Sequence, residues 1–142
     1  MKLKEIMTKQ VLTVHPEERV AVAARMMARN NIGSLPVCDA QGRICGMVTD
    51  RDLVVRCMAA DSPGKMKVRD VMTGNVITAA PDMEAAMAAH LMGRQQIRRL
   101  PVVKDGKLCG MISLGDLAVS EESAYDANDA LTEISSNVSV RD

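Results

Sequence analysis

An internal repeat is the feature that most constrains how this chain can fold. Ile6-Met7-Thr8 recurs 65 residues later as Val71-Met72-Thr73, and Leu35-Pro36-Val37 recurs at the same spacing as Leu100-Pro101-Val102. The second copy then lacks one residue, so the turn glycine Gly42 is matched by Gly106 at a spacing of 64. Similarity at a fixed spacing indicates that one supersecondary unit is built twice. The sequence therefore predicts two small units of the same topology.

The first part of each copy predicts a strand followed by a helix. The strand is expected at residues 11–14 and again at 76–79, each time just before a proline. Proline is favoured at the first position of a helix, and an acidic first turn is typical of helix starts. We therefore expect helices that open at Pro16 and Pro81.

The second part of each copy predicts two strands and a closing helix. In the first copy, apolar runs at 35–38 and 44–48 flank a glycine-containing turn, and the second copy repeats this pattern. A final helix is expected from Asp50 in the first copy and from Leu114 in the second. The predicted fold class is α/β (α+β), with two β-α-β-β-α subdomains. Because neither copy can cover both faces of its sheet alone, we expect them to pack with pseudo-two-fold symmetry.

The repeat also sets the expected boundaries. Domain 1 is predicted over residues 3–60, a turn-rich linker over 61–67, domain 2 over 68–120, and an acidic C-terminal tail over 121–142. The tail carries an apolar stripe at helical spacing, which predicts a short helix packed on its own domain or on a partner chain. The residues of this stripe are Ala127, Ala130, Leu131 and Ile134.

Composition excludes several classes of function. The 142 residues hold 18 Lys and Arg against 18 Asp and Glu, so the formal net charge is zero, whereas dedicated nucleic-acid binders usually carry a basic excess. Tyr125 is the single aromatic residue, so stacking platforms for single-stranded nucleic acid are absent. No apolar run reaches the roughly 18 residues of a membrane span. The four cysteines show no metal-binding spacing and are interpreted as free thiols of a cytoplasmic protein.

A motif of the form Gly-x-x-(Thr/Ser)-x-x-Asp closes each copy, from Gly46 to Asp52 and from Gly110 to Asp116. One interpretation is structural, because a hydroxyl followed three residues later by an acid forms a capping box at a helix start. The other is functional. A hydroxyl and free N–H groups at a helix start suit phosphate, and a carboxylate can accept hydrogen bonds from two ribose hydroxyls. The pairing would fit a nucleoside phosphate.

Arg98 and Arg99 form the second candidate element. A basic pair is most often a solvated surface feature. The first copy, however, has Gly33-Ser34 at the matching positions, so the repeat does not need arginine to fold. Arginine is well suited to binding phosphate oxygens, and the pair is therefore a candidate anion site.

The sequence gives no support for catalysis. His15 precedes a proline and His90 lies within a predicted helix, and neither has neighbours that resemble a catalytic triad or a metal motif. No phosphate-binding loop and no dinucleotide-binding glycine pattern is found. We therefore expect a protein that is not an enzyme and has no catalytic or metal-binding residues.

With the doubled unit and its closing motif, the chain resembles a tandem pair of cystathionine-β-synthase (CBS) domains, the Bateman module. The resemblance covers about residues 3–120 and is greatest to the small stand-alone bacterial CBS pairs. It extends to Ile97-Arg98-Arg99-Leu100-Pro101-Val102, which is similar to the nucleotide-binding repeats of the gamma subunit of AMP-activated protein kinase.

The resemblance implies two clefts, each formed by both repeats and able to bind AMP, ADP, ATP or S-adenosylmethionine. One cleft would take Thr49, Asp52, Thr73, Val76, Arg98 and Arg99. The other would take Ser113, Asp116, Thr8, Val11, Gly33 and Ser34. The two are unequal, because only the first has arginines.

The function expected from these features is that of a homodimeric, non-catalytic sensor. It would bind adenosine-containing ligands as regulators, require no cofactor, and act on another protein that the sequence does not identify. The alternative is a structural or protein-interaction CBS pair without nucleotide, for which clefts filled by Met7 or Met72 would be evidence.

Overall fold

The computed structural model describes residues 1–61, 63–120 and 122–141, and side chains within these ranges except those of residue 63 and of residues 137–141. The chain forms two compact units. We call Leu12–Val76 with Gly106–Leu108 the first-repeat unit. The rest, Met1–Val11, Ile77–Asp105 and Cys109–Asp142, is the second-repeat unit.

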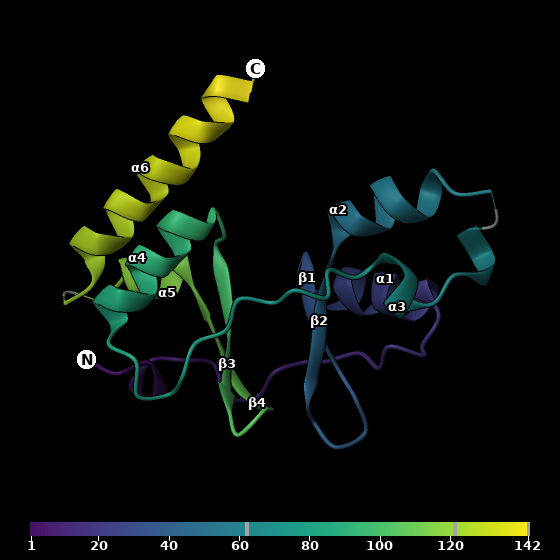
Figure 1. The fold of residues 1–142 in the computed structure, drawn as a ribbon, viewed down its shortest axis with the longest axis horizontal. Coiled ribbons are helices and arrows are strands. Elements are labelled where there is room, and N and C mark those ends of the chain that lie inside the picture. The colour runs from purple at the N-terminus through teal and green to yellow at the C-terminus, as the bar shows by residue number, and fades with distance from the viewer. Residues whose placement is uncertain (62, 121, 142) are drawn as a thin grey trace. The chain divides into compact units, whose positions relative to one another are not determined.

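The first-repeat unit is built around an antiparallel hairpin (Figure 1). Its pairing places Leu35 opposite Val48 and Pro36 opposite Met47, with an irregularity after Val37. The helices and strands of the unit are α1 (Val20–Asn30), β1 (Ser34–Cys38), β2 (Ile44–Thr49), α2 (Asp50–Asp52), the π-helix η2 (Leu53–Met58), the 3-10 helix η3 (Pro63–Lys65) and α3 (Val68–Val71).

The second-repeat unit repeats this arrangement and adds one helix. The hairpin pairs β3 with β4, as β1 pairs with β2. Its elements are η1 (Leu3–Glu5), α4 (Ala85–Gln95), β3 (Arg99–Lys104), β4 (Lys107–Ser113), α5 (Leu114–Ala118) and α6 (Ala124–Arg141). The predicted hairpin strands and closing helices are confirmed in both copies. The C-terminal helix is also confirmed, and its 18 residues make it longer than the short helix expected.

The beginnings of the two copies differ from the prediction. The helices do not open at Pro16 and Pro81 but four residues later, at Val20 and Ala85. The residues between form a turn, in which the Glu18 N–H donates to the His15 carbonyl at 3.0 Å. The expected first strands are reduced to single parallel bridges, of Val14 with Val37 and of Ala79 with Val102.

Each unit is completed by a segment that belongs, by sequence, to the other repeat. Residues 1–8 pack in the second-repeat unit and residues 66–73 in the first-repeat unit. The contacts match pairwise: the Val20 N–H donates to the Met66 carbonyl at 3.1 Å, and the Ala85 N–H donates to the Met1 carbonyl at 2.8 Å. The segments also extend the hairpins, because Thr73 pairs with Met47 as Thr8 pairs with Met111. Residues 1–8 and 66–73, which we call the exchanged segments, thus each pack on the repeat to which they do not belong by sequence.

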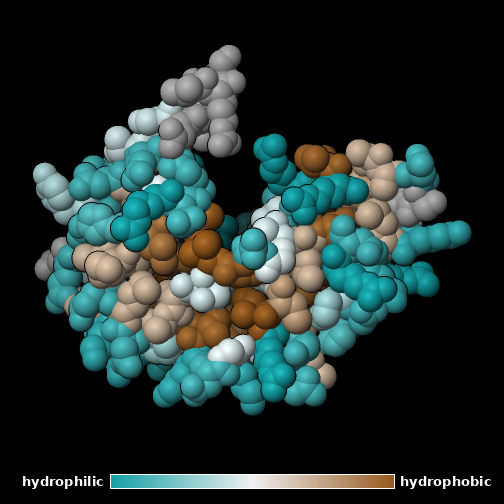
Figure 2. Space-filling model, viewed as in Figure 1, coloured by the Kyte–Doolittle hydropathy of each residue, from teal (hydrophilic) through white to brown (hydrophobic). Residues whose placement is uncertain are grey.

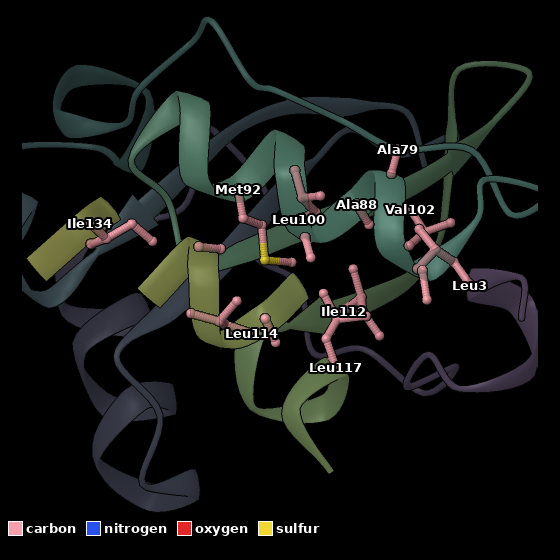
Figure 3. Close-up of a cluster of buried hydrophobic side chains, with 14 residues drawn as sticks. Leu3, Ala79, Ala88, Met92, Leu100, Val102, Ile112, Leu114, Leu117 and Ile134 are labelled. Carbon is pink, nitrogen blue, oxygen red and sulfur yellow. The ribbon is translucent and has the colours of Figure 1, made fainter. Parts of the chain in front are cut away.

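Both units have an aliphatic core. In the second-repeat unit, side chains from the hairpin, η1, α4, α5 and α6 converge on one cluster, in which Met92, Leu100 and Ile112 are fully buried (Figure 3). Ala127, Ala130 and Ile134 attach α6 to this cluster. Leu131, which the predicted stripe also included, is instead 41% exposed. No helix in the described part of the chain is both long and apolar enough to cross a membrane.

Candidate functional site

The closing motif of each repeat forms a capping box. The Asp52 N–H donates to Thr49 Oγ1 and the Thr49 N–H donates to Asp52 Oδ2, both at 3.0 Å. In the second repeat, the Asp116 N–H donates to Ser113 Oγ at 3.0 Å and the Ser113 N–H donates to Asp116 Oδ2 at 2.9 Å. The structural interpretation of the motif is therefore confirmed in both copies.

Capping uses only one oxygen of each carboxylate. The second oxygen of Asp52 lies 3.8 Å from Arg56 Nε, and the Asp52 side chain is 13% exposed. Asp116 is half-buried and has no ion-pair partner among the described residues. It lines a hollow of about 530 Å³ together with Ile6 and Ser120. A carboxylate oxygen thus remains beside each cap that could accept further hydrogen bonds.

The glycine of the motif has a packing role. A Cβ atom at Gly46 would lie 2.6 Å from the Thr73 carbonyl oxygen and 2.8 Å from Met72 Sδ. A Cβ atom at Gly110 would lie 2.5 Å from Met7 Sδ and 3.0 Å from the Thr8 carbonyl oxygen. Each strand needs glycine at this position because the exchanged segment crosses the strand too closely to leave room for a side chain. Met7 and Met72 therefore pack over the hairpins.

The predicted binding residues divide between the units. Thr49, Asp52, Thr73 and Val76 all lie in the first-repeat unit, as do Gly33 and Ser34. Ser113, Asp116, Thr8 and Val11 all lie in the second-repeat unit, as do Arg98 and Arg99. Thr8 and Thr73 are exposed, and Val11 and Val76 are half-buried. Since each predicted cleft draws on both units, its full composition remains a prediction.

Arg98 directly precedes β3 and Arg99 begins it, and both line a groove of about 590 Å³ within the second-repeat unit. Ser113 lies in the same groove, with apolar and small side chains of α5 and α6. The Arg98 backbone is fixed there, because its carbonyl accepts a hydrogen bond from the Leu114 N–H at 2.8 Å. Both arginine side chains are exposed and have no ion-pair partner among the described residues.

The matching positions of the first repeat carry the opposite charge. The Asp50 N–H donates to the Gly33 carbonyl at 2.9 Å, the counterpart of the Leu114 bond to Arg98. A Cβ atom at Gly33 would lie 3.1 Å from Asp50 Oδ2. The first repeat thus has Asp50 where the second has Leu114, and Gly33 where the second has Arg98. The alignment of the two copies contains this difference, since Asp50 stands where the second copy has Leu114, so the signal is present in the sequence.

Cys38 and Glu17 are two of the described groups whose pKa values are perturbed. Burial raises the pKa of the Cys38 thiol to about 11, so this cysteine is a poor nucleophile at neutral pH. The hydrogen bond from Lys67, at 2.9 Å, lowers the pKa of Glu17, and the charge of Arg69 contributes in the same direction. Cys38 belongs to β1 and Glu17 to the turn before α1, where it contacts the exchanged segment, so neither group lies in the motif.

Comparison with known proteins identifies the same repeats. The family model of the CBS domain matches residues 3–58 and 68–121. The CBS domain-containing protein YhcV of Bacillus subtilis is 42% identical over 133 residues, which are 94% of each chain. The inosine-5'-monophosphate dehydrogenase of Methanocaldococcus jannaschii is 36% identical over 90% of this chain, but over only 25% of its own.

A solved structure gives the same fold. The CBS domain pair of protein MJ0100, in complex with 5'-methylthioadenosine and S-adenosyl-L-methionine, matches with a TM-score of 0.73 and 28% identity. The match covers 83% of this chain and 93% of that one. The ligands are those of MJ0100.

Proposed function

Because the chain belongs to the CBS domain family, as a tandem pair, we propose that it is a regulatory module that binds adenosine-containing ligands and catalyses no reaction. The expected ligands are AMP, ADP, ATP or S-adenosylmethionine. A similar CBS pair, that of MJ0100, holds two adenosine derivatives, which supports this class of ligand.

The observation that carries the proposal is the half-used carboxylate of each motif. Asp52 and Asp116 each cap a helix with one oxygen, so capping and ribose binding do not compete for the same atom. The exposed side chains of Arg98 and Arg99 supply positive charge for a phosphate. Charged hydrogen bonds to a ligand are each worth roughly 1.5–3 kcal/mol.

A thermal-shift screen with the four ligands tests the proposal. A ligand that binds the folded protein stabilises it by about 2.7 kcal/mol at a hundredfold excess over its Kd. In a chain of this size that corresponds to a rise in Tm of several degrees. Inosine and inorganic phosphate serve as controls. No shift with any adenosine-containing ligand at millimolar concentration would favour the alternative, a protein-interaction module without nucleotide.

We further propose that the protein forms a homodimer and transmits ligand binding to another protein. Val54, Val55 and Met58 of η2 are 63%, 54% and 71% exposed, which is unusual for three apolar residues on one short helix. Figure 2 shows apolar side chains at the surface in this region. Exposed apolar patches often mark protein interfaces.

A further inference from the structure

We infer that helix α6 forms one wall of an anion-binding groove, so that binding of a phosphorylated small molecule and docking of α6 favour each other. The groove lies within the second-repeat unit, between the start of β3, the start of α5, and α6. The inference rests on the proposed function in one respect, the use of Arg98 and Arg99 to bind phosphate. It adds a part of the chain that the CBS match, which ends at residue 121, does not include.

Helix α6 packs on the core of the unit through one face, and Ala127, at the edge of that face, also lines the groove. Ala127, Ala130 and Ile134 are buried in the core cluster of the unit. A Cβ atom at Gly93 would lie 3.2 Å from the Ala130 Cα, so α4 and α6 approach closely. Figure 1 shows the two helices packed along each other, in agreement with their contacts.

The groove-lining residues of α6 follow helical spacing. They are Ala124, Ala127, Asn128 and Leu131. This spacing of three and four residues places them along one face of a helix. Asn128 is exposed, and its backbone carbonyl accepts a hydrogen bond from Thr132 Oγ1, which leaves the side-chain amide outside that bond. The face therefore offers one amide and an apolar surface.

The charge of the groove favours an anion. Arg98 and Arg99 line it, and no aspartate or glutamate is among its lining residues in the described chain. The repeat explains why the charge is uncompensated: Leu114 stands where the first repeat has Asp50, whose carboxylate lies beside Gly33. Two guanidinium groups without acidic partners are well suited to a phosphate.

The side chains that form the walls of the groove indicate the chemistry of the ligand beyond its phosphate. Leu114 and Ala118 of α5 face the groove with Leu131 of α6. The volume of about 590 Å³ lies within the range of small-molecule sites. The chemistry therefore fits a phosphorylated small molecule whose apolar part contacts both helices. A ligand that contacts α6 only when the helix is docked must stabilise the docked state.

The test measures binding of two probes, ADP and inorganic pyrophosphate, by titration calorimetry to the full chain. Asn128→Asp adds a negative charge to the groove with almost no change of shape, and we expect it to weaken the binding of both probes about tenfold. Arg98→Gly with Arg99→Ser, which copies the first repeat, should abolish binding. Ser136→Asp adds the same charge to an exposed position of α6 that does not line the groove, and should bind as wild type does.

Hydrogen exchange provides a second readout, which reports on α6 itself rather than on affinity. Addition of ADP to the wild-type protein should slow exchange of the α6 backbone amides, and the double arginine variant should show no such slowing. Unchanged exchange in α6 at saturating ADP would overturn the coupling. Circular dichroism and Tm establish that each variant is folded before its affinity is interpreted.

The outcomes separate this inference from the proposed function. If the arginine variant loses binding but Asn128→Asp binds ADP normally, the arginines serve a site without α6 and the inference is wrong. If pyrophosphate binds and Asn128→Asp weakens it, while no adenosine-containing ligand is preferred, the groove stands and the proposed ligand class is wrong. If neither probe binds at millimolar concentration, the groove is no phosphate site.

Discussion

At the scale of single residues, the motif glycines show that packing and helix capping share one sequence pattern. Gly46 and Gly110 open the motifs, and both lie against the exchanged segment of the other repeat. No local pattern could predict this, because the contacting residues Met72 and Met7 belong by sequence to the other copy. The capping box was predictable, since Thr49 and Asp52 lie three residues apart in the chain.

Gly46→Ala should destabilise the protein more than Gly110→Ala. At Gly46 the new Cβ atom would meet a backbone carbonyl at 2.6 Å, whereas at Gly110 the nearest atom is Met7 Sδ, the end of a flexible side chain, and the carbonyl is 3.0 Å away. Overpacking of this kind costs about 1–3 kcal/mol. Chemical denaturation measures the difference. Gly74→Ala is the control, because nothing lies within 4 Å of its Cβ position. Equal losses at Gly46 and Gly74 would contradict the packing argument.

Cys38 should resist alkylation in the folded protein. Its side chain is buried and its pKa is raised to about 11, so at pH 8 the reactive thiolate is scarce. Mass spectrometry after brief treatment with iodoacetamide should find Cys38 unmodified in native protein and modified in urea. Rapid modification of the native protein would show that the strand carrying Cys38 opens readily.

At the scale of elements, the exchanged segments are fixed by ion pairs that repeat with the fold. Glu17 contacts Lys67 and Arg69, each at 2.9 Å, and Asp82 contacts Lys4 at 3.1 Å.

The sequence repeat predicted the hairpins and closing helices, because their signals are local apolar runs. It did not predict the exchange of segments, or the helix starts at Val20 and Ala85 that the segments determine, since these depend on contacts between distant residues.

The ion pair of Glu17 should contribute stability that depends on pH. Its pKa is lowered in the folded protein from the ordinary value of 4.5 by the hydrogen bond from Lys67. A lowered pKa adds stability above the ordinary value, and this stability is lost as pH falls through the folded-state pKa. Glu17→Gln should therefore lower Tm slightly at pH 7, and the difference from wild type should shrink as the pH falls below 4.5.

Glu18→Gln is the matched control for this series. Glu18 is exposed, and it contacts the exchanged segment through its backbone carbonyl, which accepts from the Val68 N–H at 2.8 Å. The Tm of the Glu18→Gln variant should follow that of wild type from pH 7 to pH 3. A Glu17→Gln difference that persists unchanged at pH 3 would mean that the carboxylate charge is not its cause.

At the scale of the whole molecule, we expect η2 to form the interface of the proposed dimer. Val54→Glu with Met58→Glu places two charges on a patch whose side chains are more than half exposed, so the fold should survive. Light scattering at micromolar concentration should give a dimer mass for wild type and a monomer mass for the variant. Val119→Glu, at an 86% exposed apolar position outside η2, is the control. A monomeric wild type would contradict the proposal.

The central claim is that the motif aspartates bind the ribose of an adenosine-containing ligand while they cap their helices. Asp52→Asn and Asp116→Asn test it, because the asparagine oxygen can still accept the hydrogen bond from the Thr49 or Ser113 N–H. Titration calorimetry with the ligand that gives the largest thermal shift should show at least about tenfold weaker binding for one or both variants, at nearly unchanged Tm. Wild-type affinity in both variants would contradict the claim and leave the motif a capping box alone.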